Sequence, residues 1–324
     1  MTKNVWILID DRAGSNNQAR GVAAALGWNI VEKKISYNRW ANLPNLFLGA
    51  GLLGIDEASK QAVQGPFPDL VIAASRRAAP VARWIKKHSL KQTKIVQIMH
   101  PGNVGLNDFD KIFVSEHDLH KKQSANMYFI TGSAHRITAE TLADAKEKWQ
   151  QDFAHLPRPL TAVIVGGSYK GHEFSRENAI ALGQQISRYK QSQGGSILIT
   201  DSRRTGSVAQ NAIMQEIKDI PSYRYLWGNN DGKNPYIGFL ACADDIIVTG
   251  DSVSMCCEAC GAGKKVQIFC GERWLDKKHW SFINSLLQRK LAFLLGDEIP
   301  ADVTWSHHNP ANEIAEQIRK LFIN

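Results

Sequence analysis

VIVGGSYKGH, residues 163–172, carries the strongest fold signal in the sequence. A short run of β-branched apolar residues enters a glycine-rich turn, and Ser175 then opens a segment with helical spacing. Glycine lets a backbone approach a phosphate closely, and a helix N-terminus supplies unpaired N–H groups with a partial positive charge. The stretch therefore predicts a strand–turn–helix unit with an anion site at Gly166, Gly167 and Ser168. The alternative is a tight turn that binds nothing.

The same succession of strands and helices extends in both directions from this turn. Before it, we expect strands at 5–10, 29–35, 69–74, 94–99, 111–115 and 127–131, and helices at 17–26, 78–88 and 138–152. After it, we expect strands at 161–165, 196–200, 223–226, 245–249 and 265–270, and helices at 175–191, 207–218, 235–243, 252–262, 276–291 and 310–322. Such alternation is typical of parallel sheets with crossover helices, so the fold class is α/β.

One segment interrupts the pattern: FAHLPRP, residues 153–159. Its two prolines end the preceding helix and suit a linker, and a chain of 324 residues is long enough for two domains. We therefore expect an N-terminal domain at 1–155, a second domain at 156–308 and a terminal helix at 309–324.

Composition limits the partners and the compartment. The net charge of +8 favours anionic partners, but the basic pairs are scattered and no zinc-finger or RNP pattern is present, so we expect no nucleic acid. No apolar stretch is long enough to span a membrane, and the apolar strand at 5–9 leaves no room for a signal peptide. Four of the five cysteines fall between Cys242 and Cys260, which favours a reducing compartment over a disulfide framework. We expect a cytoplasmic protein.

Two later loops offer further anion ligands. Ser202 and Arg203 follow the strand at 196–200, and hydroxyls and guanidinium groups bind phosphate oxygens well; the alternative is a solvated loop whose arginines pair with Asp201. The strand at 245–249 leads into DSVSMCCEA, residues 251–259. There Asp251 or Ser252 can cap a helix whose N–H groups face an anion.

That helix carries three more candidates: Ser254, Met255 and Glu258. Glu258 lies on the same face as Ser254 by i, i+4 spacing, where its carboxylate could accept hydrogen bonds from sugar hydroxyls. The alternative is simple capping and packing through Met255 and Ala259.

The first half offers candidates for acid–base chemistry. Asp11 lies in the loop between the first strand and the first helix, with Gly14 and Gln18 close behind it. His100 follows the strand at 94–99, and its ordinary pKa near working pH suits a general base; the alternative is a structural histidine.

Other motifs either lack a residue that their chemistry requires or allow two interpretations. The single C-x-x-C at 257–260 lies within a helix without a second pair, so we expect no metal site. No tyrosine is followed four residues later by lysine, which argues against an NAD-dependent sugar epimerase. The apolar stretch LPNLFLGAGLLGI, residues 43–55, is either a core segment or an apolar lip that enters a membrane beside basic residues.

Taken together, these pieces resemble the "elongated mitochondria" (ELM) family of mitochondrial fission proteins, whose bacterial members are regarded as glycosyltransferases. The resemblance rests on Asp11, Gly14 and Gln18, on PDLVI at 68–72, SEHD at 115–118, GGS at 166–168, SRRT at 202–205, and TGDSVSM at 249–255 with Glu258. These pieces occur in family order, and DSVSM is the most specific. One departure is Ala74 before Ser75-Arg76-Arg77, where glycine would be more usual, which puts the tightness of that turn in doubt.

The resemblance implies a GT-B arrangement: two Rossmann-like domains facing each other across a cleft, with the last helix crossing back to the first domain. It also implies a nucleotide-diphosphate sugar in the second domain, with no obligatory cofactor or metal. Gly167, Ser168, Ser202 and Arg203 would then hold the diphosphate. The donor pocket and sugar hydroxyls would fall to Ser252, Ser254, Met255 and Glu258, and Gly14, Gln18, Gly166 and Asp251 complete the nucleotide-sugar set. Asp11 and His100 are the candidate bases.

Two functions follow from this resemblance. The first is a glycosyltransferase that moves a sugar to a cell-envelope acceptor, with a membrane surface or a lipid-linked acceptor as a partner at the inner face of the membrane. The second is a non-catalytic, membrane-associated adaptor that keeps the fold and recruits a partner.

Overall fold

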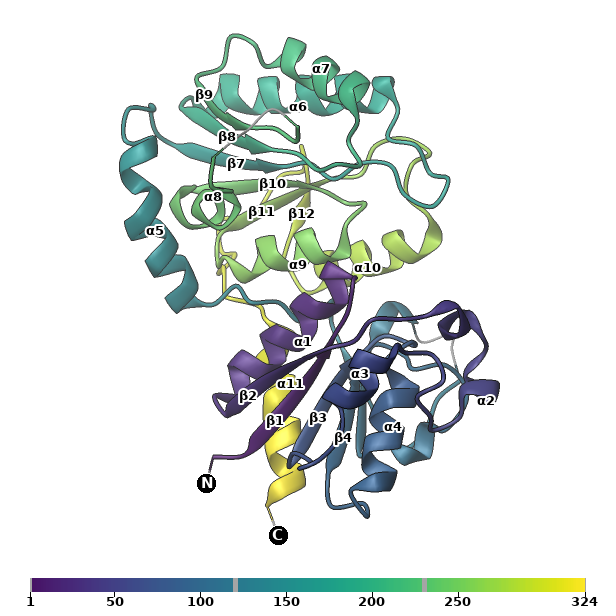
Figure 1. Ribbon diagram of the computed structural model, residues 1–324. Coiled ribbons are helices and arrows are strands. Elements are labelled where there is room, and N and C mark those ends of the chain that lie inside the picture. Colours follow the sequence, from purple (N-terminus) through teal and green to yellow (C-terminus); the bar gives the residue numbers. More distant parts are fainter. Residues whose placement is uncertain (1, 119–121, 229–231, 324) are drawn as a thin grey trace. The chain divides into compact units, whose positions relative to one another are not determined.

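The protein consists of two compact units (Figure 1). The structure, a computed structural model, describes residues 2–118, 122–228 and 232–323. Unit 1 is Met1–Arg136 together with Pro310–Asn324, and unit 2 is Ile137–Asn309.

Unit 1 is built on a parallel six-stranded sheet with the strand order β2-β1-β3-β4-β5-β6. Its strands are β1 (Asn4–Ile9), β2 (Asn29–Lys34), β3 (Leu70–Ala74), β4 (Lys94–Ile98), β5 (Lys111–Ser115) and β6 (Met127–Ile130). Its α-helices are α1 (Ala13–Leu26), α2 (Asn45–Leu48), α3 (Glu57–Ala62), α4 (Ala79–His88) and α11 (Pro310–Arg319). The central strand β3 is buried along its whole length, as expected for a parallel strand covered on both faces.

The terminal helix α11 belongs to unit 1. Its buried side chains, which include Ile314 and Ile318, share one apolar cluster with Val22 and Leu26 of α1. Helix α11 is strongly amphipathic, so this packing covers the only broad apolar stripe it has. The chain thus returns to its first unit at its end (Figure 1).

Unit 2 holds a second parallel six-stranded sheet, with the strand order β12-β11-β10-β7-β8-β9. Its strands are β7 (Leu160–Ile164), β8 (Ser196–Thr200), β9 (Ser222–Tyr225), β10 (Asp245–Thr249), β11 (Lys265–Phe269) and β12 (Phe293–Leu294). The chain starts at β7, adds β8 and β9 on one side, and then returns to place β10 on the other side of β7. Strand order therefore reverses between β7 and β10, and this is where open α/β sheets bind ligands.

The helices of unit 2 are α5 (Ala139–Phe153), α6 (Arg176–Gln193), α7 (Ser207–Glu216), α8 (Tyr236–Cys242), α9 (Val253–Gly261) and α10 (Lys277–Gln288). Ser175 caps α6 by accepting a hydrogen bond from the Asn178 N–H at 3.2 Å, which gives the helix the start expected from the sequence.

The division between the units comes before α5, whereas the sequence placed it after this helix. Phe153 of α5 packs edge-on against Tyr223 and lies 5.5 Å, centroid to centroid, from Phe239 of α8. Gly238 allows close approach, because a Cβ there would lie 2.5 Å from the Trp149 ring. The prolines at 157–159 thus break the chain between two elements of one unit and do not separate the units.

The described residues include two α-helices and one strand that were not expected from the sequence: α2, α3 and β12. Each is six residues or shorter, so periodicity carries little signal for it. Within the described ranges, no helix is both long enough and apolar enough to cross a bilayer.

Candidate functional site

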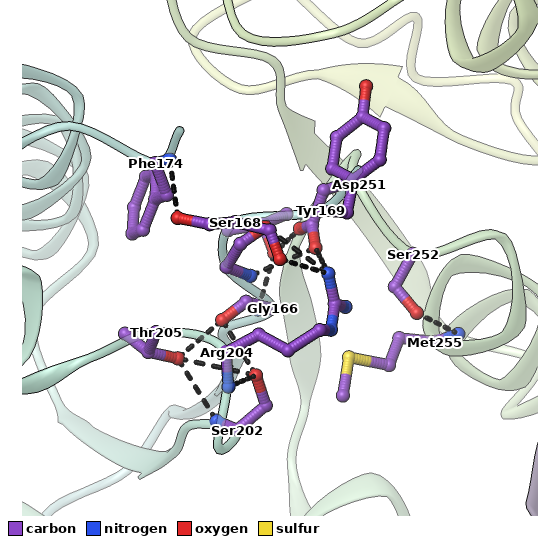
Figure 2. A network of polar contacts seen from close by, with 12 residues as sticks. Gly166, Ser168, Tyr169, Phe174, Ser202, Arg204, Thr205, Asp251, Ser252 and Met255 are labelled. Carbon is purple, nitrogen blue, oxygen red and sulfur yellow. Dashed lines mark hydrogen bonds and ion pairs between the residues drawn. The ribbon is translucent and has the colours of Figure 1, made fainter. Parts of the chain in front are cut away.

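Three loops of unit 2 meet at the C-terminal edge of its sheet, after β7, β8 and β10 (Figure 2). They contain Gly166–Ser168, Ser202–Thr205 and Gly250–Ser252. These are the three loops that the sequence singled out, and the fold brings them to the point where strand order reverses.

The backbone amides of the glycine-rich turn are used inside the protein. Gly166 N–H donates to the Thr249 hydroxyl at 2.7 Å, and Gly167 N–H donates to the Asp251 carboxylate at 2.9 Å. Ser168 N–H donates to the Arg204 carbonyl at 3.0 Å. The expectation that this turn offers its amides to a diphosphate is therefore wrong for the structure described.

The glycines serve close packing of the loops. A Cβ at Gly166 would lie 2.2 Å from Asp251 Oδ1, and a Cβ at Gly167 would lie 2.2 Å from the Arg204 carbonyl carbon. Both distances are far below van der Waals contact. The glycines are thus required so that the loops after β8 and β10 can close on the loop after β7.

Asp251 is the centre of the network. Its side chain is fully buried and accepts hydrogen bonds from Gly167 N–H and from the Thr249 hydroxyl, the latter at 2.8 Å. Burial raises the pKa of this carboxyl, while the nearby Arg204 guanidinium and the hydrogen bonds act in the opposite direction. Arg204 Nη1 lies 2.8 Å from Asp251 Oδ2 and completes a buried ion pair.

Arg204, not Arg203, is the arginine that the fold holds in place. Its Nη1 also donates to the carbonyls of Gly167 and Ser168, each at 3.2 Å. About a third of its side chain stays exposed, and Figure 2 shows it extending from the β8 loop to the carboxylate of Asp251, the residue before the Ser252 cap of α9. Arg203 is exposed and makes no ion pair or side-chain hydrogen bond among the described residues.

The hydroxyls of the β8 loop are also internal. Ser202 donates to the Gly166 carbonyl at 2.9 Å, and Thr205 donates to the same carbonyl. Asp201 accepts from Trp227 N–H at 2.6 Å and from the Gln210 amide at 2.7 Å. Ser202 therefore fixes the shape of the site, because its hydroxyl proton is already donated to the Gly166 carbonyl and is not available to a phosphate. The alternative in which Asp201 pairs with the arginines is not observed among the described residues either.

Helix α9 begins at this edge with unpaired donors. Ser252 caps it, its Oγ accepting a hydrogen bond from Met255 N–H at 3.4 Å. Within the described residues, the N–H groups of Val253 and Ser254 have no acceptor. They point along the axis of a helix whose dipole is positive at this end.

Glu258 lies one turn further along α9 than Ser254 and is fixed in place. The Tyr236 hydroxyl donates to its Oε2 at 2.6 Å. Burial, together with the neighbouring Glu258 carboxylate, raises the pKa of Tyr236 well above its usual value, so the phenol stays a donor.

In unit 1, Asp11 takes part in an ion-pair cluster. Arg77 Nη2 donates to Asp11 and also to Asp10, the latter at 3.3 Å. The Arg77 guanidinium lies 4.3 Å from the centre of the Tyr37 ring. The Asp11 side chain is 72% exposed, so it remains accessible to a ligand despite this pairing.

His100 has both ring nitrogens engaged. Nδ1 accepts a hydrogen bond from Gly102 N–H at 3.1 Å, which places the proton on Nε2. Nε2 then donates to the Lys122 carbonyl at 2.8 Å. Both ring nitrogens of His100 are therefore hydrogen-bonded within unit 1, which favours the structural alternative, and its role as a base stays a prediction.

Gly14 and Gln18 lie in the first turns of α1. A Cβ at Gly14 would meet open space, and Gln18 is 8% exposed without a hydrogen bond to any described residue. Both belong to unit 1, while the other nucleotide candidates belong to unit 2. Their role in nucleotide-sugar binding stays a prediction.

Residues 13–322 match the protein family described as mitochondrial fission ELM1. The chain belongs to the ELM1 family. It is 31% identical to the uncharacterized protein RP120 of Rickettsia prowazekii, over 98% of both chains. It is 28% identical to the mitochondrial fission protein ELM1 of Arabidopsis thaliana, over 85% of this chain and 68% of that protein.

Solved structures with this fold include nucleotide-sugar enzymes. The UDP-GlcNAc 2-epimerase from Methanocaldococcus jannaschii matches 98% of this ELM1-family chain and 99% of its own, with a TM-score of 0.60 at 13% identity. A second structure of that epimerase, in complex with UDP-GlcNAc and UDP, gives a TM-score of 0.53 at 13% identity. This likeness confirms the expected two-domain, GT-B-like α/β fold.

For this ELM1-family site, sequence reasoning assigned no separate role to Arg204 or Thr249, although both stand in the SRRT and TGDSVSM motifs, and it did not single out Tyr236. For Arg204 a signal existed, because it stands beside Arg203 in the same motif. Periodicity could not choose between them, since both lie in a turn where side chains follow no fixed alternation.

Proposed function

We propose that unit 2 binds a nucleoside diphosphate sugar at the C-terminal edge of β7 and β10, and that the protein transfers the sugar to another molecule. The observation that carries this proposal is the start of α9: two N–H groups without acceptors among the described residues, which closely follow Asp251, the ion-pair partner of Arg204, at the reversal of strand order. Backbone donors, a helix dipole and arginine together suit a diphosphate.

The roles follow from the geometry around α9. The N–H groups of Val253 and Ser254 would bind one phosphate, and the exposed part of Arg204 would bind the other. Glu258, fixed by the Tyr236 hydroxyl, would accept hydrogen bonds from ribose or sugar hydroxyls, and Met255 would line the donor pocket. The fold relative solved with UDP-GlcNAc and UDP supports this ligand class.

Transfer then needs few protein groups. An acceptor oxygen attacks the anomeric carbon, the bond from this carbon to the diphosphate oxygen breaks, and the diphosphate leaves with its negative charge. Arg204 and the start of α9 would stabilise that charge. Asp11 is the exposed candidate to take the acceptor proton, and we propose a lipid-linked acceptor of the cell envelope at the cytoplasmic face of the membrane.

Titration calorimetry with UDP and with UDP-, GDP-, CMP- and ADP-sugars tests the binding step. Arg204 is the tested residue, and the adjacent Arg203 is its matched control. Arg204→Lys should weaken binding about tenfold or more, because a charge-assisted bond contributes about 1.5–3 kcal/mol. Arg203→Ala should change it less than about threefold. Equal losses in both variants would refute the assigned role, and no heat with any nucleotide would refute the proposal.

A non-catalytic adaptor is the second candidate, and one observation favours it: His100 is engaged at both nitrogens and Asp11 is ion-paired. Chromatography of UDP-GlcNAc incubated with the protein separates the alternatives. UDP released only when a lipid acceptor is added indicates transfer. A new UDP-sugar formed without acceptor indicates epimerisation, and an unchanged donor across all acceptors favours the adaptor.

A further inference from the structure

Unit 1 exposes several large apolar side chains on α2, in the segment after it and at the end of α4. Leu46 and Phe47, on α2, are 68% and 69% exposed, and Leu53 is 52% exposed. Leu90, directly beyond α4, is 84% exposed. We call these four residues the apolar ridge. The sequence left open whether the stretch at 43–55 is a core segment or an apolar lip, and the exposure of its large side chains favours the lip.

Two arginines brace the backbone that presents this ridge. Arg76 donates to the carbonyls of Leu43 and Ala41, at 2.8 and 3.2 Å. Arg83 donates to the Gly49 carbonyl at 2.8 Å. Helix α2 is thus tied at both ends to α4 and the turn before it, and its apolar side chains are displayed by an ordered element at the outer edge of unit 1 (Figure 1).

Leu90 is displayed by a strained turn. Leu90 and Lys91 both have a left-handed backbone, with φ of 52° and 64°. Lys91 N–H donates to the Lys86 carbonyl at 2.9 Å and so caps the C-terminal end of α4. Glycine adopts the left-handed backbone of such a cap most easily. The side chain of Leu90 is thus held outward by a closed helix end.

Basic side chains surround the ridge. A hollow of about 680 Å³ joins the end of α2 to the end of α4, and its lining is Ala50, Arg83, Lys86, Lys87, Leu90, Lys91, Asn107 and Asp108. Asp108, the one carboxylate in this lining, is paired with Arg83 at 2.6 Å. Lys87 and Lys91 are exposed and make no ion pair among the described residues.

We propose that the apolar ridge docks unit 1 on the surface of a bilayer that contains anionic lipids. Leucine and phenylalanine enter the boundary of the acyl chains, while lysines beside them bind lipid phosphates. A flat bilayer fits side chains that project outward from two neighbouring elements. The excess of positive charge on the lining makes the phosphate surface the complementary partner. This proposal is independent of what unit 2 binds.

Co-sedimentation of the full chain with lipid vesicles tests the proposal. Binding is expected to vesicles that contain phosphatidylglycerol and to be much weaker with phosphatidylcholine alone. The double variant Leu46→Ser/Phe47→Ser should lose about tenfold or more of its vesicle affinity. Lys87→Glu/Lys91→Glu should abolish the preference for the anionic lipid and the sensitivity to salt.

The matched control is Val208→Ser, which removes an apolar side chain that is 64% exposed on α7 of unit 2. It should bind vesicles as the unchanged chain does. All variants alter exposed side chains, so their thermal midpoints should agree, and UDP binding measured alongside reports unit 2 separately. Failure of the unchanged chain to bind anionic vesicles would overturn the proposal, as would an equal loss in Val208→Ser. Binding to polyglutamate but not to vesicles would assign the ridge to an acidic protein and overturn it too.

Discussion

Replacing Asp251 by alanine should destabilise unit 2 strongly. The substitution removes a fully buried carboxylate and leaves Gly167 N–H, the Thr249 hydroxyl and the Arg204 guanidinium without their shared acceptor. Breaking one side of a buried ion pair costs about 3–5 kcal/mol. Because a third of Arg204 is exposed and can be rehydrated, we expect the lower end, about 3 kcal/mol. For a unit of this size that lowers the thermal midpoint by about 6–12 °C.

Scanning calorimetry of the full chain measures this change. Asp251→Asn is the matched control, because its amide oxygen can still accept from Gly167 N–H, while its NH2 group takes the place of Oδ1 and can donate to the Thr249 hydroxyl; we expect about 1–2 kcal/mol of destabilisation. The reasoning is refuted if Asp251→Ala loses less than about 1 kcal/mol, or if both variants lose the same amount.

Three further predictions concern Glu258, Lys264 and helix α5. Glu258→Gln should weaken UDP-sugar binding, measured by calorimetry, about 10- to 100-fold. Tyr236→Phe should weaken it less, since the Glu258 carboxylate remains. A larger effect of Tyr236→Phe would contradict the roles assigned to these two residues. Burial lowers the pKa of Lys264 to about 8 from its usual 10.5. Between these pH values the unfolded chain binds more protons than the folded one, so the free energy of unfolding rises with pH. Lys264→Met should remove this rise in urea titrations, and the same dependence of the unfolding free energy on pH in the variant would contradict the prediction. Fragment 137–309 should show cooperative thermal unfolding when followed by circular dichroism, while fragment 156–308, which lacks α5, should not. The opposite result would support the domain boundary that the proline-containing segment predicted.

Much of the fold could be predicted from the sequence because each strand is a short apolar run between helices. The runs at 69–74 and 245–249 contain β3 and β10 with nearly the expected ends. The boundary between the units could not be predicted. It depends on Phe153 packing against Tyr223 and Phe239, a contact between distant segments, while the prolines at 157–159 carry a strong local signal.

The position of the site in the sheet was predictable, but which of its donors are available to a ligand was not. Polar loops after β7, β8 and β10 must meet at one edge of a parallel sheet, so their assembly follows from topology. Which donors remain free depends on side chains from other loops. Asp251 and Thr249 occupy the amides of Gly167 and Gly166, and the same ion pair selects Arg204 over Arg203.

Hydrogen exchange of backbone amides, measured with and without saturating UDP, locates the ligand most directly. The proposed site predicts slower exchange at the start of α9, greatest at Val253 and Ser254, with little change at Gly166 and Gly167, whose amides are already bonded. Protection that appears at those two glycines while the start of α9 stays unchanged, or no protection in unit 2 at all, would contradict it.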